Sequence, residues 1–353
     1  MAQSAATPPP PARSVGPAAS PGGHDRHRPT AHRHTYAALD LGTNNCRLLI
    51  ARPVFNGFVV IDAFSRVVRL GEGLALSGQL SKEAMDRAVG ALAICADKLV
   101  RRNVSLSRSV ATEACRRAAN GREFIERVKR ETGVVLEIIP PAEEARLAVL
   151  GCHKLLEPGG GPALIFDIGG GSTELVLVEP GEGEAAPRIR AWWSAPWGVV
   201  SLTESEGREA LEGPDRVRAY ERMRERVRRS FARFVEMLPE EKANVGLLGT
   251  SGTVTTLASV HLALPAYDRR AVDGLSVPVA DMRRISTMIA EMDFSGRAGL
   301  PCIGSDRADL VVAGCAILEA ILDIWPAEKL GVADRGIREG ILRSLMARDG
   351  YAL

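Results

Sequence analysis

Three short turns in this sequence combine glycine with small hydroxyl and amide side chains, a composition suited to binding phosphate. They lie at residues 40–45, 167–173 and 249–253. Glycine allows a sharp turn and lets backbone N–H groups approach an anion, while serine, threonine and asparagine add neutral donors. One such turn is equally well explained as a polar hairpin turn, but a matched pair and a third turn favour phosphate binding. The predicted phosphate-binding residues in them are Gly42, Thr43, Asn44, Asn45, Gly169, Gly170, Gly171, Ser172, Thr173, Ser251, Gly252 and Thr253.

Two aspartates open the first two turns, and each directly follows an apolar run. These residues are Asp40 and Asp167. Magnesium prefers oxygen ligands and keeps several of its waters, so a carboxylate at each strand end suits it. The alternative is that each aspartate only accepts hydrogen bonds from the backbone of its own turn. We predict that this pair holds Mg²⁺.

The elements that must position these turns alternate between strands and helices. Ser81 can cap a helix whose apolar residues recur at spacings of three and four, and a second helix should stop at Gly133. Asn56 and Gly57 form a hairpin signal between two strands. In the first half, strands are predicted near residues 36–40, 48–51, 58–61, 109–112 and 134–139, and helices near 81–102 and 122–133.

The second half restarts this pattern with an apolar strand at 163–167. Residues 167–180 align with residues 40–53 without a gap, and Asp, Gly, Leu and Pro match at corresponding places. The period is too long for a solenoid, so the alignment predicts two copies of one domain. Further elements are expected at 214–238 (helix), 245–248 (strand) and 335–347 (helix). Alternating strands and helices predict an α/β fold.

The bulk composition excludes several classes of protein. The 353 residues carry a formal net charge of only +2, which favours neither nucleic acid nor a membrane surface as a partner. The six scattered cysteines lack the spacing of zinc sites or of a disulfide framework, and no apolar stretch is long enough for a membrane span. We therefore expect a soluble, cytoplasmic protein. Residues 1–34 contain few large apolar side chains and are predicted to be a disordered tail.

Seven segments, taken in order, resemble the motif set of the exopolyphosphatase and guanosine pentaphosphate phosphohydrolase (Ppx/GppA) family in its short, two-domain form. Together they cover nearly the whole chain after residue 35, and their order makes chance agreement improbable. They are residues 40–44, 69–73, 111–116, 143–145, 167–174, 249–253 and 335–340.

This resemblance implies a fold and an activity. It implies two duplicated domains of the actin-like ATPase and sugar-kinase (ribonuclease H-like) fold with a central cleft, at residues 35–147 and 148–353. The final helix is a candidate to pack back on the first domain. The implied enzyme removes terminal orthophosphate from inorganic polyphosphate with Mg²⁺, and guanosine pentaphosphate is the alternative substrate.

Four residues take their expected roles from the resemblance. The family's general base corresponds to Glu144, where a carboxylate would orient and deprotonate the attacking water. Glu143 should point elsewhere, because neighbouring residues do not share a helix face. Arg116 matches the family's phosphate-contacting arginine, and Arg69 and Arg307 are further candidates because they lie inside matched motifs.

The sequence also departs from the family and leaves alternatives open. Pro140 and Pro141 precede the glutamate pair where the family commonly has Ser-Gly, which predicts a stiffer approach to the base. The chain ends after the second domain, which predicts fewer subsites for long polyphosphate. A kinase-like transferase and a non-catalytic polyphosphate or alarmone sensor remain as alternatives, and a homodimer is left open.

Overall fold

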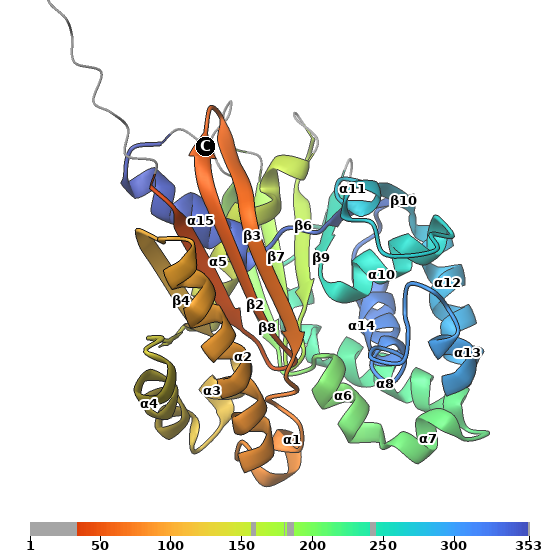
Figure 1. The fold of residues 1–353 in the computed structure, drawn as a ribbon. Coiled ribbons are helices and arrows are strands. Elements are labelled where there is room, and N and C mark those ends of the chain that lie inside the picture. Colours follow the sequence, from red (N-terminus) through yellow and green to blue (C-terminus); the bar gives the residue numbers. More distant parts are fainter. Residues whose placement is uncertain (1–33, 157–159, 180, 182–186, 241–244, 352–353) are drawn as a thin grey trace, which may run out of the picture. The chain divides into compact units, whose positions relative to one another are not determined.

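Two mixed β-sheets, flanked by helices, make up the part of the chain that the computed structural model describes, namely residues 34–156, 160–179, 181, 187–240 and 245–351 (Figure 1). The first sheet has the strand order β3-β2-β1-β4-β5, and the second has the order β10-β11-β9-β6-β7-β8. The strands of the first sheet are β1 (Tyr36–Leu41), β2 (Asn45–Val54), β3 (Gly57–Val67), β4 (Leu106–Ala111) and β5 (Glu137–Ile138). The strands of the second sheet are β6 (Ala163–Ile168), β7 (Thr173–Glu179), β8 (Arg188–Ala195), β9 (Gly246–Thr250), β10 (Ser276–Pro278) and β11 (Lys329–Ala333).

The helices fall between and after these strands. Those before β6 are α1 (Leu74–Ser77), α2 (Lys82–Arg101), α3 (Glu113–Arg117), α4 (Gly121–Thr132), α5 (Pro141–Cys152) and the 3₁₀ turn η1 (His153–Leu155). Those after β8 are α6 (Val199–Glu206), α7 (Arg208–Glu212), α8 (Arg216–Ser230), α9 (Ala232–Val235), α10 (Gly252–His261), α11 (Arg269–Val272), α12 (Val279–Glu291), α13 (Phe294–Ala298), α14 (Val311–Ile324) and α15 (Ile337–Arg348).

The two sheets repeat one topology, as the internal alignment predicted. Each begins with an antiparallel three-stranded meander, β1-β2-β3 in the first and β6-β7-β8 in the second. The next long strand then pairs in parallel with the first strand of the meander, so β4 lies beside β1 and β9 lies beside β6. The glycine turns therefore occupy equivalent positions at the ends of β1 and β6.

Local signals explain two of the helix boundaries. The Ser81 side chain caps α2 by accepting a hydrogen bond from the Ala84 N–H at 3.2 Å, and Gly133 ends α4 in the left-handed conformation at φ 73°. Strand β5 is shorter than predicted because it pairs with β4 at only two positions. The helix predicted over 214–238 is interrupted at Phe231, which separates α8 from α9. The predicted tail lies, up to residue 33, outside the described residues.

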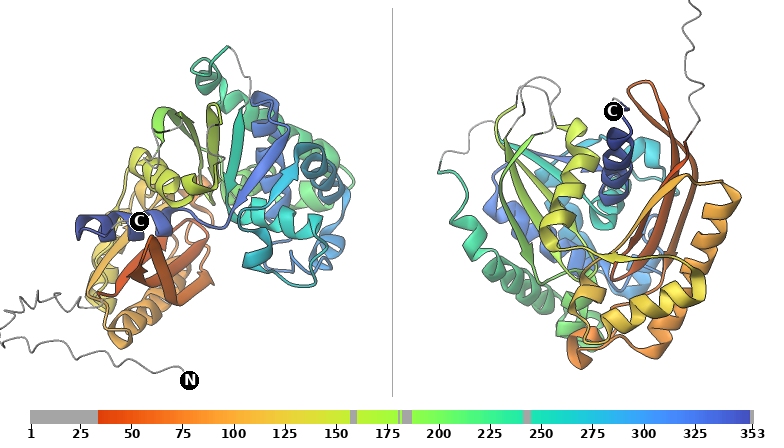
Figure 2. Two further views of the ribbon diagram at one scale, coloured as in Figure 1. Left: turned by 90° about the horizontal axis from the view of Figure 1, so that it is seen from above. Right: turned by 90° about the vertical axis from the view of Figure 1, so that its left-hand side faces the viewer.

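Helices cover both faces of each sheet (Figure 2). On one face of the first sheet, Leu39 and Leu41 pack in a core with Ala88 of α2 and Phe124 of α4. On its other face, the core contains residues of α5 and α15, for example Leu147 and Ile341. The opposite side of α5 contributes Ala145, Val149 and Cys152 to a core with β6 and β7 of the second sheet. The helix α5 is therefore shared between the two sheets.

The helices α5 and α15 pack with their backbones in contact. A Cβ atom at Gly151 would lie 2.0 Å from the Gly336 carbonyl oxygen, and one at Gly340 would lie 2.0 Å from the Leu147 carbonyl oxygen. No side chain fits in such gaps, so these positions require glycine. The contact fixes the N-terminal turn of α5, which carries the glutamate pair, relative to both sheets.

Two findings bear on the predicted class of protein. All six cysteines carry free thiols and are buried. Among the described residues, no helix combines the length and apolar character that crossing a bilayer would require.

Candidate active site

A cavity of about 140 Å³ lies where the three glycine turns meet. Its wall includes residues of the first turn after β1, the second turn after β6 and the third turn after β9. The first two turns touch each other: a Cβ atom at Gly170 would lie 3.1 Å from the Asn44 nitrogen, and one at Gly171 would lie 2.7 Å from Thr43 Oγ1. Glycine is therefore required in the second turn because the first turn approaches it so closely.

Most of the predicted site residues line this cavity. The residues that do so are Asp40, Gly42, Thr43, Asn44, Asn45, Glu144, Asp167, Gly169, Gly170, Gly171, Ser172, Ser251, Gly252, Thr253 and Arg307. Three others do not line it. Thr173 is fully buried and donates to the Trp197 carbonyl oxygen at 2.7 Å, Arg69 forms an ion pair with Asp309 at 3.2 Å, and Arg116 contacts glutamates.

Arg116 holds the side chain of Glu144 in place. Both terminal nitrogens of Arg116 donate to Glu144 Oε2 at 3.2 Å, and its Nη2 and Nε also donate to Glu113 Oε2 at 2.7 and 3.1 Å. Its Nη1 further donates to the Ile139 carbonyl oxygen at 2.6 Å. Within the described residues, Glu144 Oε1 accepts no hydrogen bond. One oxygen of this 6%-exposed glutamate is therefore fixed, and the other is available to a water in the cavity.

The neighbouring Glu143 has a different environment, as the helix geometry predicted. Its carboxylate accepts hydrogen bonds from Arg108 at 2.7 Å and from Arg146 at 2.7 and 2.9 Å, which lower the pKa of Glu143 to about 2. Glu143 does not line the cavity. Pro140 and Pro141 occupy the N-cap and the first turn of α5, where proline is tolerated because those N–H groups have no helical partner.

Four carboxyl groups come together at the cavity with raised pKa values. Burial, followed by the nearby Glu174 carboxylate, raises the pKa of Glu144 well above the ordinary glutamate value, against the effect of Arg116. Burial and Glu174 also raise the pKa of Asp167 to about 8. Burial raises the pKa of Asp40 and Glu174 as well, although two serine hydroxyls donate to Glu174 Oε1 at 2.7 and 2.9 Å. Such a cluster cannot be fully ionised without added positive charge.

The chemistry of these donors fits a magnesium ion. Asp40 Oδ1 is buried and has no hydrogen-bond partner in the described structure, and hard carboxylate oxygens are what Mg²⁺ prefers. No group of three or more His, Cys, Asp or Glu side chains that could hold a metal ion occurs among the described residues. A site supplying one or two carboxylates, here Asp40 and Asp167, suits magnesium, which usually keeps waters and binds substrate phosphate.

The cavity also has groups that attract anions. Arg307 lines it and donates to Thr256 Oγ1 at 2.8 Å. Ser251 caps α10 by accepting from the Val254 N–H at 3.1 Å, and the first residues of this helix, Gly252 and Thr253, line the cavity. The positive end of a helix dipole and its unpaired N–H groups favour phosphate.

The prediction missed three charged residues of the wall: Arg47, Glu113 and Glu174. Pairing within the hairpins places Arg47 opposite Asp40 and Glu174 opposite Asp167. The sequence contained enough information to find Arg47 and Glu174, because a tight turn after Asp40 or Asp167 places the residue seven positions later beside the aspartate. Glu113 lay inside a matched motif, but nothing in the sequence indicated that it shares Arg116 with Glu144.

Comparisons of sequence identify related proteins. The sequence pattern of the Ppx/GppA phosphatase family matches residues 49–349. The exopolyphosphatase 2 of Mycobacterium tuberculosis is 33% identical over 323 residues, which cover 88% of this chain and 98% of that protein. The guanosine-5'-triphosphate,3'-diphosphate pyrophosphatase of Aeromonas salmonicida is 27% identical over 321 residues, which cover 89% of this chain and 60% of that protein.

Solved structures give the same result for the fold. The crystal structure of the Aquifex aeolicus member of the Ppx/GppA family superposes with a TM-score of 0.72 at 30% identity, over 90% of this chain and 99% of that one. The crystal structure of an exopolyphosphatase-like protein superposes with a TM-score of 0.79 at 28% identity, over 89% of this chain and 99% of that chain. The predicted α/β class with duplicated actin-like ATPase domains is confirmed.

Proposed function

Because the chain belongs to the Ppx/GppA phosphatase family, a family of phosphoanhydride hydrolases, we propose that it releases the terminal orthophosphate of inorganic polyphosphate. The observation that carries this proposal is the position of Glu144, in one cavity with three glycine turns and with one oxygen unengaged. A carboxylate, a space for water and a phosphate cradle are the parts that phosphoryl transfer to water requires.

In the proposed reaction, the glycine turns and Arg307 hold the terminal phosphate by backbone N–H groups, hydroxyls and a guanidinium. A water beside Glu144 Oε1 attacks the terminal phosphorus, its proton passes to Glu144, and the bond from phosphorus to the bridging oxygen breaks. The bridging oxygen leaves as the new end of the shortened chain. Arg116 positions Glu144 from behind, rather than contacting phosphate as the resemblance implied, because its donors are directed to Glu113, Glu144 and Ile139.

Magnesium bound at Asp40 and Asp167 would offset negative charge on the phosphates and on the carboxyl cluster. The raised pKa values support this role, since Glu144 can act as a base only when it is ionised. Added positive charge beside the cluster favours that ionised form.

Two observations favour polyphosphate over guanosine pentaphosphate. The cavity wall, as far as the structure describes it, contains no aromatic side chain on which a guanine base could stack. The exopolyphosphatase relative also matches over 98% of its length, against 60% for the guanosine-phosphate enzyme. Guanosine pentaphosphate is therefore the comparison substrate in the test.

The test is orthophosphate release from long-chain polyphosphate and from guanosine pentaphosphate, with Mg²⁺ or with EDTA. Glu144→Gln should lower kcat by about 10²- to 10⁴-fold, the usual contribution of a general base. The matched control is Glu143→Gln, one residue away on the same helix, which should retain activity within a few-fold. EDTA should abolish release.

Three outcomes would contradict parts of this proposal. Equal activity of wild type and Glu144→Gln would remove Glu144 as the base. Faster release from guanosine pentaphosphate would reverse the substrate assignment. Binding of polyphosphate without release under any condition would favour the sensor.

A further inference from the structure

Five arginines form a stripe along the exposed side of α8 and α9. They recur at intervals of four, four, three and four residues, which places the four on α8 within about 80° of arc at 100° per residue, and the fifth follows on α9 after the turn at Phe231. The side chains of the first four are 83%, 51%, 36% and 77% exposed, and the fifth residue is also exposed. The members of this arginine stripe are Arg218, Arg222, Arg226, Arg229 and Arg233.

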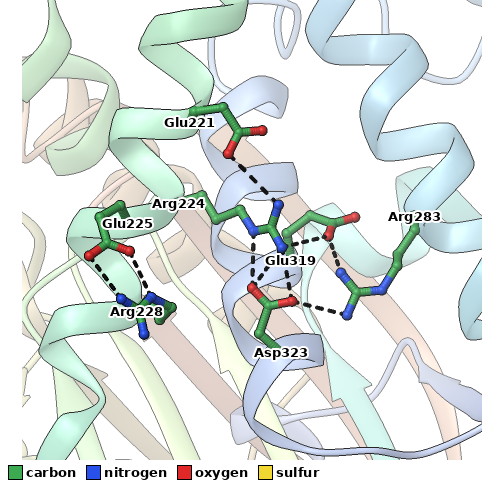
Figure 3. A network of polar contacts seen from close by, with 7 residues as sticks. All are labelled: Glu221, Arg224, Glu225, Arg228, Arg283, Glu319 and Asp323. Carbon is green, nitrogen blue, oxygen red and sulfur yellow. Dashed lines mark hydrogen bonds and ion pairs between the residues drawn. The ribbon is translucent and has the colours of Figure 1, made fainter.

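The stripe differs from the inward-facing arginine of the same helix. Figure 3 shows that Arg224 lies between the carboxylates of α14, where it donates to Asp323 at 2.8 to 3.0 Å and pairs with Glu319. Arg283 of α12 contacts the same two acids. With Glu221 also 3.8 Å from Arg224, this network ties α8, α12 and α14 together and offsets both guanidinium charges, so Arg224 and Arg283 have a structural role.

The stripe itself carries more positive charge than its neighbours offset. Among the described residues, three carboxylates pair with it and with the adjacent Arg228. Glu206 serves both Arg222 and Arg226, Glu225 serves both Arg228 and Arg229, and Asp215 lies 3.6 Å from Arg218. No ion pair of Arg233 occurs in the described part of the chain. Arg233 is the last member of the stripe, and three residues later the C-cap of α9 is the acidic Glu236.

Packing contacts connect the stripe to the wall of the cavity. The Arg226 guanidinium carbon lies 5.6 Å from the centre of the Trp197 ring. The Trp197 carbonyl oxygen accepts the Thr173 hydroxyl, and a Cβ atom at the next residue, Gly198, would lie 2.4 Å from the Gly170 carbonyl carbon. One aromatic residue therefore separates the stripe from the second glycine turn.

We propose that the arginine stripe is a second binding site, which holds the phosphates of a linear polyphosphate that lie beyond the end bound in the cavity. This inference rests on the proposed function. From Arg218 to Arg229 the helix α8 rises about 16 Å, so the stripe can engage several successive phosphates. Guanidinium groups bind phosphate oxygens in pairs, and α8 contains arginine but no lysine. The stripe would favour long chains over short ones.

The test removes two exposed charges from the stripe in the full-length protein by Arg218→Gln with Arg229→Gln. The matched control removes two exposed charges from the helices on the first sheet, by Arg101→Gln with Arg130→Gln. Arg130 is 70% exposed and Arg101 is exposed, with a backbone carbonyl as its partner. The readouts are the Kd for long-chain polyphosphate and for tripolyphosphate at several salt concentrations, and KM for the same two substrates.

The stripe variant should raise the ratio of the long-chain Kd to the tripolyphosphate Kd about tenfold, and KM should follow it. The slope of log Kd against log salt should fall by about 1.4, at about 0.7 for each lost contact with a single-stranded polyanion. The control should bind like wild type. An unchanged ratio, or an equal change in the control, overturns the stripe as a binding site. Because Kd needs no turnover, the proposal stands or falls separately from catalysis.

Discussion

The backbone contact between α5 and α15 yields a prediction about one added methyl group. Gly340→Ala would place a Cβ atom 2.0 Å from the Leu147 carbonyl oxygen of the facing helix. Ordinary contact between non-bonded atoms needs about 3.5 Å, so the helices must separate by roughly 1 to 1.5 Å. The obstacle is main chain and cannot rotate away.

The expected cost follows from the packing around this contact. Forcing a methyl group into a close-packed site costs about 1–3 kcal/mol, and the upper value applies because the obstacle is backbone. Alanine recovers up to about 1 kcal/mol through its higher helix propensity. We therefore expect Gly340→Ala to lower the free energy of unfolding by about 2 kcal/mol. Since α5 carries Glu144, a shift of about 1 Å should also lower kcat by up to about 10²-fold.

The same substitution at Gly90 is the control. Gly90 lies inside α2, and a Cβ atom there would meet no atom within 4 Å. Gly90→Ala should raise the free energy of unfolding by about 1 kcal/mol through helix propensity alone and leave kcat unchanged. Urea denaturation of both variants should therefore separate them by about 3 kcal/mol. If Gly340→Ala is as stable as Gly90→Ala, the two backbones are not in contact.

Two further predictions concern the proposed base. The kcat/KM of the wild type should fall with decreasing pH, because burial and Glu174 raise the pKa of Glu144 and the protonated form cannot accept a proton. The acid limb should move to lower pH as Mg²⁺ is raised toward saturation, since added positive charge favours the ionised form; a limb that does not respond to Mg²⁺ would contradict this. Arg116→Gln should lower kcat by about 10²-fold with little change in KM and move the acid limb to higher pH, since Arg116 opposes the rise in the pKa of Glu144; a large rise in KM with an unchanged limb would instead indicate direct phosphate contact.

The predictable part of this molecule is the part that local sequence determines. Apolar runs, glycine turns and the Ser81 cap identified the elements around the three turns because their causes lie within a few residues of chain. Several later elements, such as β8, α12 and α14, were not predicted. The central cleft was expected from the family resemblance, and the three turns line one cavity. The predicted ends of strands and helices were less accurate. For β5, the length depends on how far β4 continues beside it.

Long-range contacts explain where the prediction for the site was incomplete. Arg116 and Glu144 are 28 residues apart, and neither sequence position shows that one guanidinium is shared by Glu113 and Glu144. The requirement for glycine at Gly151 and Gly340 arises from a facing helix almost two hundred residues away. Such requirements come from tertiary packing, which overrides local preference.

The duplication suggests how one repeated unit came to serve two tasks. The two hairpins place different residues at one equivalent position, Arg47 beside Asp40 and Glu174 beside Asp167. The positive charge of Arg47 lowers the pKa of both aspartates, whereas Glu174 raises that of Asp167 and of Glu144. The two hairpins therefore place opposite charges beside otherwise equivalent aspartates. Glu144, on the helix shared by the two sheets, lines the same cavity as both aspartates, and the proposed attacking water would lie beside it there.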